Sequence, residues 1–221
     1  MVEFLKVVAD WFLHLDGYLE VLVTSYGPWI YVILFLVIFA ETGLVVMPFL
    51  PGDSLLFATG MLAAKYGMNP LLLIIVLVIA AVLGDTVNYH IGRYIGPKVF
   101  REDAPKNFFL KLLKKEYLEQ GQAFYEKHGG KTIIMARFVP IVRTFAPFVA
   151  GVSTMNYSRF ISFNIIGGVI WVAGLLLAGY FLASIPFVRE HFEHVVLAII
   201  FVSILPIIFE LIRSKKSNKK I

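Results

Sequence analysis

The chain has 221 residues, of which 59% are hydrophobic and only 16% charged. A soluble domain carries about 25% charged residues, so this composition predicts an integral membrane protein. The sequence contains no cysteine, which excludes disulfides, thiolate metal sites and cysteine nucleophiles. The net charge of +5 does not point to nucleic acid, because most basic residues fall in two clusters beside apolar segments, as membrane topology requires.

The first part of the chain predicts an interfacial helix and a broken apolar segment. Residues 2–23 alternate apolar and acidic positions at helical spacing, so residues 1–26 are expected to form an amphipathic helix in the membrane interface. Trp29–Met47 is apolar and nearly long enough to cross the hydrocarbon core. The sequence PFLPGD at residues 48–53 cannot continue that helix, and Ser54–Ala64 is too short to span. A short arm after such a break predicts a re-entrant hairpin.

The second part repeats this order behind a full span and a basic loop. Pro70–Ile95 predicts a transmembrane helix, and residues 96–131 form the most basic loop of the chain. An apolar arm at Thr132–Val139 leads into a second broken stretch, followed by a span from about Phe160 to Leu182. A last transmembrane helix is predicted at residues 194–212.

The segment Arg137–Gly151, RFVPIVRTFAPFVAG, breaks the rules for a lipid-facing helix. It carries two arginines, Arg137 and Arg143, and two prolines, Pro140 and Pro147, among apolar residues. A guanidinium at the bilayer centre costs at least ~2.5–3.5 kcal/mol on insertion scales, and proline removes a backbone donor. Broken backbone at membrane depth is tolerated only where protein or a water-filled cavity surrounds it. We therefore expect a second re-entrant hairpin with two buried or cavity-facing cations, and we expect the function to reside there.

The basic residues also predict the orientation. The basic loop and the basic tail at residues 213–221 should both be cytoplasmic, which places both termini in the cytoplasm and opens the two hairpins to opposite sides. Residues 28–95 and 132–182 share a Pro-broken arm, a charged residue, a glycine and a long span, as in the inverted repeats of secondary transporters. The charged residues and glycines that correspond are Asp53 and Gly60 in the first half, and Arg143 and Gly151 in the second.

The predicted fold is therefore an all-α integral membrane protein with one membrane domain, residues 1–221. It combines an inverted-repeat architecture and two opposed re-entrant helical hairpins with several transmembrane helices and the N-terminal amphipathic helix.

Five ionisable residues within or beside the apolar segments are candidates for function: Glu41, Asp53, Asp85, Arg137 and Arg143. Ionisable groups at membrane depth are costly, so we interpret them first as functional residues. Three of these residues also have structural alternatives. Asp53 could be the N-cap of a helix, Arg137 could snorkel to the cytoplasmic interface, and Glu41 could form a purely structural salt bridge with an arginine.

As a set, the five residues predict an anion site. Arginine presents a planar donor fork suited to phosphate oxygens, and partly buried carboxylates can exchange protons near neutral pH. We assign phosphate binding to Arg137 and Arg143, proton coupling to Glu41 and Asp53, and an additional candidate role to Asp85. The histidines are scattered without metal-binding spacing, and no Walker loop or dinucleotide fingerprint occurs, so we expect no metal and no cofactor.

Five motifs spread over nearly the whole chain resemble the DedA family of bacterial inner-membrane proteins, within the SNARE-associated Golgi protein or VTT-domain superfamily. They are FAETG (39–43), FLPGDSLL (49–56), GDTVNYHIGR (84–93), FYEKHGG (124–130) and RFVPIVRTFAPFVAG (137–151).

The resemblance implies a set of roles. The family's essential acidic pair matches Glu41 and Asp53, and its essential arginine pair matches Arg137 and Arg143. Family members are linked to membrane-potential maintenance, cell division and envelope stress resistance. Some are described as translocases that return undecaprenyl phosphate across the membrane, others as acting on phosphatidylethanolamine, and the superfamily includes eukaryotic lipid scramblases.

Residues and resemblance together predict a proton-coupled lipid transporter, or flippase, of the bacterial inner membrane that carries undecaprenyl phosphate from the outer to the inner leaflet. Its expected partners are the lipid phosphate, protons and membrane lipids, without nucleic acid. The sequence leaves open which lipid is carried and whether the protein forms a homo-oligomer.

Three alternative functions require different features of the protein. A phospholipid scramblase or phosphatidylethanolamine translocase needs a hydrophilic groove but no proton coupling. In a small-cation/proton antiporter, Glu41 and Asp53 would form the ion site and the arginines would be structural. An enzyme such as a lipid phosphatase is disfavoured, because the sequence shows no nucleophile–His–Arg arrangement.

Overall fold

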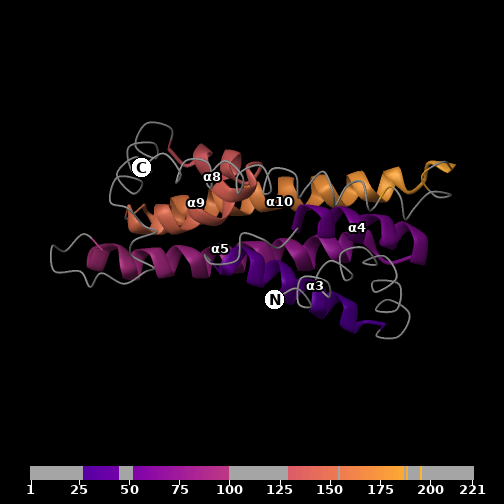
Figure 1. Cartoon of the computed structure of the whole chain (residues 1–221), viewed down its shortest axis with the longest axis horizontal. Helices are drawn as coiled ribbons and strands as arrows, with labels where there is room; N and C mark the ends of the chain where they lie inside the picture. Colours follow the sequence, from indigo (N-terminus) through magenta and orange to yellow (C-terminus); the bar gives the residue numbers. More distant parts are fainter. Residues whose placement is uncertain are drawn as a thin grey trace, which may run out of the picture. The chain divides into compact units, whose positions relative to one another are not determined.

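A computed structural model of the chain describes residues 27–44, 52–99, 129–153 and 155–186, together with Val188 and Val195. These residues form helices and connections without any strand, which confirms the all-α prediction for the described part. The helices, labelled in Figure 1, are α3 (Trp29–Gly43), α4 (Gly52–Tyr66), α5 (Pro70–Val99), α8 (Lys131–Ala136), α9 (Pro140–Val152) and α10 (Tyr157–Leu182).

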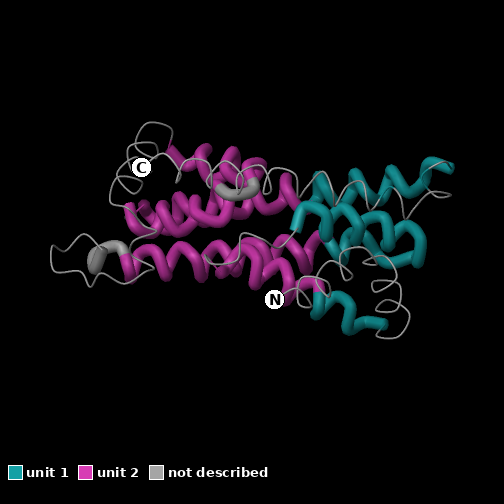
Figure 2. Tube along the Cα trace, in the orientation of Figure 1, with its two compact units in different colours: residues 1–33, 49–73, 173–221 teal, residues 34–48, 74–172 magenta. Residues whose placement is uncertain are grey.

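The chain divides into two compact units (Figure 2). Unit 1 comprises residues 1–33, 49–73 and 173–221, and unit 2 comprises residues 34–48 and 74–172. Helices α3, α5 and α10 each contribute residues to both units, whereas α4 belongs to unit 1 and α8 and α9 belong to unit 2.

Several predicted elements lie outside the described residues. They are the N-terminal amphipathic helix at residues 1–26, most of the basic loop at 96–131, most of the last transmembrane helix at 194–212, and the basic tail at 213–221.

Two helices of the described part, α5 and α10, are long and apolar enough to cross a membrane. Each contains an apolar segment of 26 residues, Pro70–Ile95 and Tyr157–Leu182, which at 1.5 Å per residue is about 39 Å long. The hydrocarbon core is about 30 Å thick, so both helices exceed it. The first segment confirms the predicted helix over Pro70–Ile95.

Both long helices begin at an asparagine that follows a methionine. The side-chain Oδ1 of Asn69 accepts hydrogen bonds from the N–H groups of Leu71 and Leu72, and Oδ1 of Asn156 does the same for Ser158 and Arg159. These side chains satisfy N–H groups that a helix start leaves without partners. The cap at Asn156 explains why α10 begins three residues before the predicted Phe160.

Helix α3 ends earlier than the sequence pattern predicts. Its last helical residue is Gly43, whereas the apolar pattern continues to Met47. At this point α3 crosses α5, and a Cβ at Gly84 would meet the hydroxyl of Thr42 and the backbone of Phe39. The apolar run alone does not carry this information.

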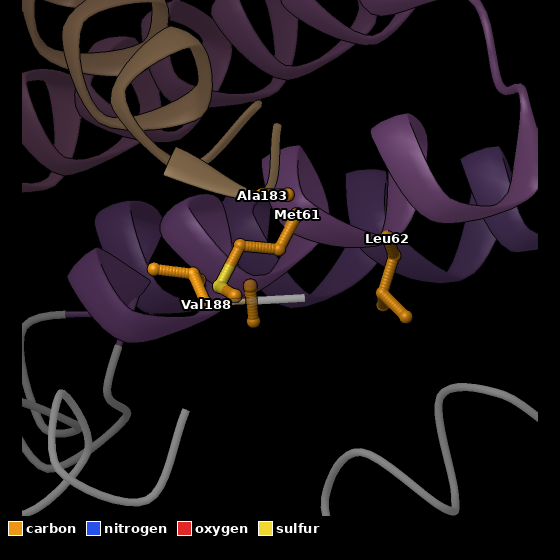
Figure 3. Packing of buried hydrophobic residues seen from close by; sticks show 5 residues of the cluster. Met61, Leu62, Ala183 and Val188 are labelled. Carbon is orange, nitrogen blue, oxygen red and sulfur yellow. The ribbon is translucent and has the colours of Figure 1, made fainter. Parts of the chain in front are cut away.

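In unit 1, α4 packs closely on the C-terminal part of α10. A Cβ at Gly60 of α4 would meet the carbonyl of Leu176, and a Cβ at Gly179 of α10 would meet the carbonyl of Phe57. Beside this crossing lies a buried apolar cluster in which Met61 and Leu62 of α4 gather with Ala183 and Val188 (Figure 3). The absence of side chains at the two glycines therefore permits backbone-to-backbone contact, as small residues do in membrane helix pairs.

Unit 2 uses the same arrangement between α9 and α5. A Cβ at Gly151 of α9 would meet the carbonyl of Tyr89, and a Cβ at Gly92 of α5 would meet the carbonyl of Phe148. The ring of Tyr89 stacks on Phe160 of α10 with centroids 4.5 Å apart. Thus the arm of each half of the chain packs, through a reciprocal pair of glycines, on the long helix of the other half.

The predicted break within residues 137–151 is present. Helix α8 ends at Ala136, and α9 begins at Pro140 after the extended residue Val139, with φ −115° and ψ 108°. A residue before proline is disfavoured in the α region, and Pro140 lacks the N–H that a first helical residue does not need. The break therefore follows from local sequence, and Arg137 occupies it.

The glycine contacts predict a selective effect of added methyl groups on stability. We expect Gly60→Ala and Gly151→Ala each to lower the free energy of unfolding by about 1–3 kcal/mol, because the new Cβ would overlap a backbone carbonyl. Gly174→Ala is the matched control, since no atom of the described residues lies within 4 Å of its Cβ, and the change should be neutral or stabilising by up to about 1 kcal/mol. Thermal unfolding in detergent micelles would measure all three, and equal losses would contradict the close helix approach.

Candidate functional site

Four charged side chains and one indole ring meet inside unit 2. Each comes from a different helix or helix end: Glu41 from α3, Asp85 from α5, Arg137 from the C-terminal end of α8, Arg143 from α9 and Trp171 from α10. We call these five residues the charge cluster. Its two cations and two carboxylates make the cluster formally neutral.

One ion pair joins α9 to α3. Arg143 Nη2 donates to Glu41 Oε1 at 2.5 Å, and the two side chains are 10% and 1% exposed. Arg143 lies in the first turn of α9 and Glu41 in the last turn of α3, so the pair ties two helix ends together. A salt bridge between Glu41 and an arginine was one of the alternatives that the sequence allowed.

The second ion pair fixes Arg137 within the helices. Its Nη2 donates both to Asp85 and to the side-chain oxygen of Asn164, and Asn164 in turn donates to the carbonyl of Val82 at 3.2 Å. Arg137 is 5% exposed, so the alternative that it snorkels to the interface is wrong. The network gives the cation a counter-charge and a hydrogen-bond acceptor inside the protein, so the side chain does not need to reach for water.

Glycines on α10 make room for Arg137. A Cβ at Gly167 would meet Cδ and Nε of Arg137, and one at Gly168 would lie close to its guanidinium. These residues contribute more than close helix packing, because Asn164 binds the arginine and Gly167 accommodates its side chain.

The ring of Trp171 faces both arginines. Its centroid lies 5.1 Å from Cζ of Arg143 and 5.7 Å from Cζ of Arg137, and the residue is 2% exposed. An aromatic face attracts a guanidinium electrostatically, most strongly when both are shielded from water. The indole therefore offsets part of the repulsion between two neighbouring cations.

The charge cluster lines a small cavity. The cavity has a volume of about 10 Å³, close to the room that a single water needs, and Thr42 and Thr144 complete its lining. It is too small for a tetrahedral anion such as phosphate.

Stability is a poor explanation for the charge cluster. Desolvation of buried ions offsets most of the attraction between them, so a well-packed apolar core of the same volume is often at least as stable. Four charges between apolar helices are better explained by a role in function, as ionisable groups at membrane depth generally are.

Four of the five predicted site residues meet in the charge cluster: Glu41, Asp85, Arg137 and Arg143. Asp53 is the second residue of α4 and belongs to unit 1, so its participation stays a prediction. It lies in the first turn, where a carboxylate stabilises the positive end of the helix dipole.

The sequence pattern missed the two buried amides. Asn88 and Asn164 are fully buried and both bond across helices. Each is a polar residue in an otherwise apolar span, and such a residue is itself an indication of function. The charged residues gave a stronger indication. In the described part of the chain, no group of three or more histidine, aspartate or glutamate side chains is placed to hold a metal ion.

Apolar helices of membrane length and a buried charge cluster define the chain as a membrane protein. The VTT domain family matches residues 50–181. Protein DedA of Escherichia coli (strain K12) is 49% identical over 218 residues, which cover 98% of this chain and 97% of that protein. The chain belongs to the DedA family of VTT-domain membrane proteins.

Two further relatives are also membrane proteins. An uncharacterized membrane protein of Mycobacterium leprae (strain TN) is 47% identical over 170 residues, or 77% of this chain and 74% of the relative. Inner membrane protein YqjA of Escherichia coli (strain K12) is 34% identical over 182 residues, or 82% and 80%. No solved structure matches the chain.

The second ion pair predicts strong energetic coupling between its members. We expect Asp85→Leu to lower the free energy of unfolding by about 3–5 kcal/mol, because it leaves the Arg137 cation buried without its carboxylate. The double variant Asp85→Leu/Arg137→Leu should lose clearly less than the single variant. SDS titration in mixed micelles would measure these two variants and Arg137→Leu, and a double loss equal to the sum of the two single losses would show that the side chains do not interact.

Proposed function

We propose that this protein is a proton-coupled carrier of a phosphorylated lipid, and that its substrate is undecaprenyl phosphate, moved from the outer to the inner leaflet of the bacterial inner membrane. The observation that carries the proposal is the buried Arg143–Glu41 pair at 2.5 Å beside a second buried arginine. Two adjacent guanidinium groups suit the oxygens of one phosphate, and each already has a carboxylate that the phosphate can replace.

The two arginines would have different roles. Arg137 is held by both Asp85 and Asn164, and its Nε is buried without a hydrogen-bond partner among the described residues. The Nε–H of this fixed cation is therefore a donor that an anion could use. Arg143 is the more exposed of the two, at 10%, and would exchange Glu41 for a phosphate oxygen.

Proton coupling follows from the same exchange. When phosphate displaces Glu41 from Arg143, the carboxylate is left in apolar surroundings without its counter-charge, which favours the protonated form. Release of the phosphate lets Glu41 lose the proton and pair with Arg143 again. One proton would thus accompany each lipid phosphate, and Asp53 would also take part in proton exchange.

We also propose the inverted-repeat architecture with two opposed re-entrant hairpins. Two observations support it: the reciprocal glycine contacts of α4 with α10 and of α9 with α5, and the Met-Asn starts of α5 and α10. Gly60 and Gly151, which correspond in the sequences of the two halves, occupy the same kind of contact in the two units. Broken arms that meet between long helices are typical of secondary transporters.

The proposed cellular setting is the inner membrane, crossed several times, with both termini in the cytoplasm. The basic loop and tail support this orientation. The name of the relative YqjA, an inner membrane protein, supports the location. The protein would act as a transporter and not as an enzyme, because no step of the proposed cycle makes or breaks a covalent bond to the lipid.

Leaflet translocation in proteoliposomes tests this proposal. The assay would compare labelled undecaprenyl phosphate with labelled phosphatidylethanolamine, with and without a pH gradient. We expect selective, gradient-dependent movement of the polyprenyl phosphate. Arg143→Ala should slow it about 10- to 100-fold, since a hydrogen bond to a charged group is worth about 1.5–3 kcal/mol. Arg159→Ala is the matched control, because this arginine of α10 is exposed and lies outside the charge cluster.

The possible outcomes separate the function classes. Unchanged transport by Arg143→Ala would rule out the phosphate assignment. Equal movement of both lipids without any effect of the gradient would indicate a scramblase. No lipid movement at all would favour the small-cation/proton antiporter.

Glutamine in place of Glu41 tests the coupling step. Glu41→Gln keeps a hydrogen-bonding side chain of the same size but cannot bind and release a proton. We expect the remaining transport to become independent of the pH gradient. Glu41→Asp keeps the carboxylate and should retain the gradient dependence at a lower rate. A gradient dependence that persists in Glu41→Gln would assign the proton to another carboxylate.

A further inference from the structure

One buried amide connects the two helix ends that carry the Glu41–Arg143 pair. Asn88 of α5 is fully buried, and its Nδ2 donates to the carbonyl of Thr42 at 3.2 Å and to the carbonyl of Thr144 at 2.8 Å. Thr42 follows Glu41 directly, and Thr144 follows Arg143 directly. Neither of these hydrogen bonds goes to a charged group.

Both carbonyls lie where helical hydrogen bonding ends or is disturbed. Thr42 is in the last turn of α3, where carbonyls have no N–H partner within the helix. Thr144 lies in the turn of α9 before Pro147, which removes the N–H that would bond the carbonyl of Arg143 and crowds this turn. Asn88 therefore supplies donors at two points where the backbone is weakly constrained.

The contacts also fix which way the amide points. Both partners are carbonyls, so the NH₂ group must face them, and only a donor can make these bonds. The remaining Oδ1 is buried without a hydrogen-bond partner among the described residues. An unsatisfied buried acceptor disfavours the folded state, so an apolar residue would serve better here if packing were the only role.

We propose that Asn88 is a positioning residue for the exchange at Arg143. Its two hydrogen bonds hold the end of α3 and the start of α9 in the register that places Glu41 against Arg143. The consequence for transport rests on the proposed function, whereas the consequence for helix register does not. The glycine contacts of α5 with α3 and α9 are independent of Asn88, so a variant at this position should still fold.

The absence of cysteine in the chain permits a direct test by spin labelling. Labels at Leu36→Cys on α3 and Val142→Cys on α9, both at exposed positions of unit 2, would report the distance between these helices by pulsed EPR in nanodiscs. Asn88→Leu removes both donors at similar volume, and Asn88→Ser keeps one donor. Thr86→Val is the matched control, because it removes a hydrogen bond that stays within α5, from the Thr86 hydroxyl to the carbonyl of Val82.

We expect the distance distribution to broaden in the order wild type, Asn88→Ser, Asn88→Leu, and to stay unchanged in Thr86→Val. Transport of undecaprenyl phosphate by Asn88→Leu should fall about tenfold while its dependence on the pH gradient is kept, because Glu41 is still present. If Asn88→Leu cannot be purified in folded form, Asn88→Ser decides the test.

Three results would overturn the proposal. They are an unchanged distance distribution in the Asn88 variant, equal broadening in Thr86→Val, and a broadened distribution with transport at the wild-type rate. If the wild type moves no lipid, the proposed function fails, and the distance measurement alone still decides whether Asn88 sets the register.

Discussion

A guanidinium buried among apolar helices needs a counter-charge and hydrogen-bond acceptors, and this requirement organises unit 2. Arg143 forms an ion pair with Glu41. Arg137 forms an ion pair with Asp85 and donates a hydrogen bond to Asn164. Because these partners come from separate helices, the cations can be satisfied only when the helices are assembled. The same ion pairs contribute little net stability, since desolvation offsets their attraction. Removal of one member of such a pair strongly destabilises the protein, because the other charge stays buried without a partner. A bound anion, by contrast, can take the place of the carboxylate, which is the property that a carrier of an anionic lipid needs.

Close helix approach is the second constraint, because ion pairs of this kind form only where helices meet. Reciprocal glycines bring α9 to the backbone of α5 in unit 2, and α4 to the backbone of α10 in unit 1. Lipid gives helices little hydrophobic reason to associate, so close packing at small residues has to supply the attraction. The repetition of this contact in both units links the packing of the protein to its proposed internal repeat.

The two arginines of the charge cluster are chemically alike but differ in their surroundings. Arg137 lies in the break between α8 and α9 and is held by two side chains, whereas Arg143 lies on a helix and has one identified carboxylate partner. The ring of Trp171 faces both guanidinium groups. In the proposed cycle Arg137 is the fixed cation and Arg143 the exchangeable one, so substrate binding and proton uptake would become one event.

The sequence by itself determined the membrane class, the long helices, the break at Pro140 and the charged candidates. Hydropathy, proline chemistry and isolated charges are local properties, and they act before any helix meets another. Only the tertiary structure decided that Arg137 pairs with Asp85 and does not reach the interface, and that buried amides bond across helices. These features depend on which residues of distant segments come together, because a hydrogen bond or ion pair needs a partner that the local pattern does not specify.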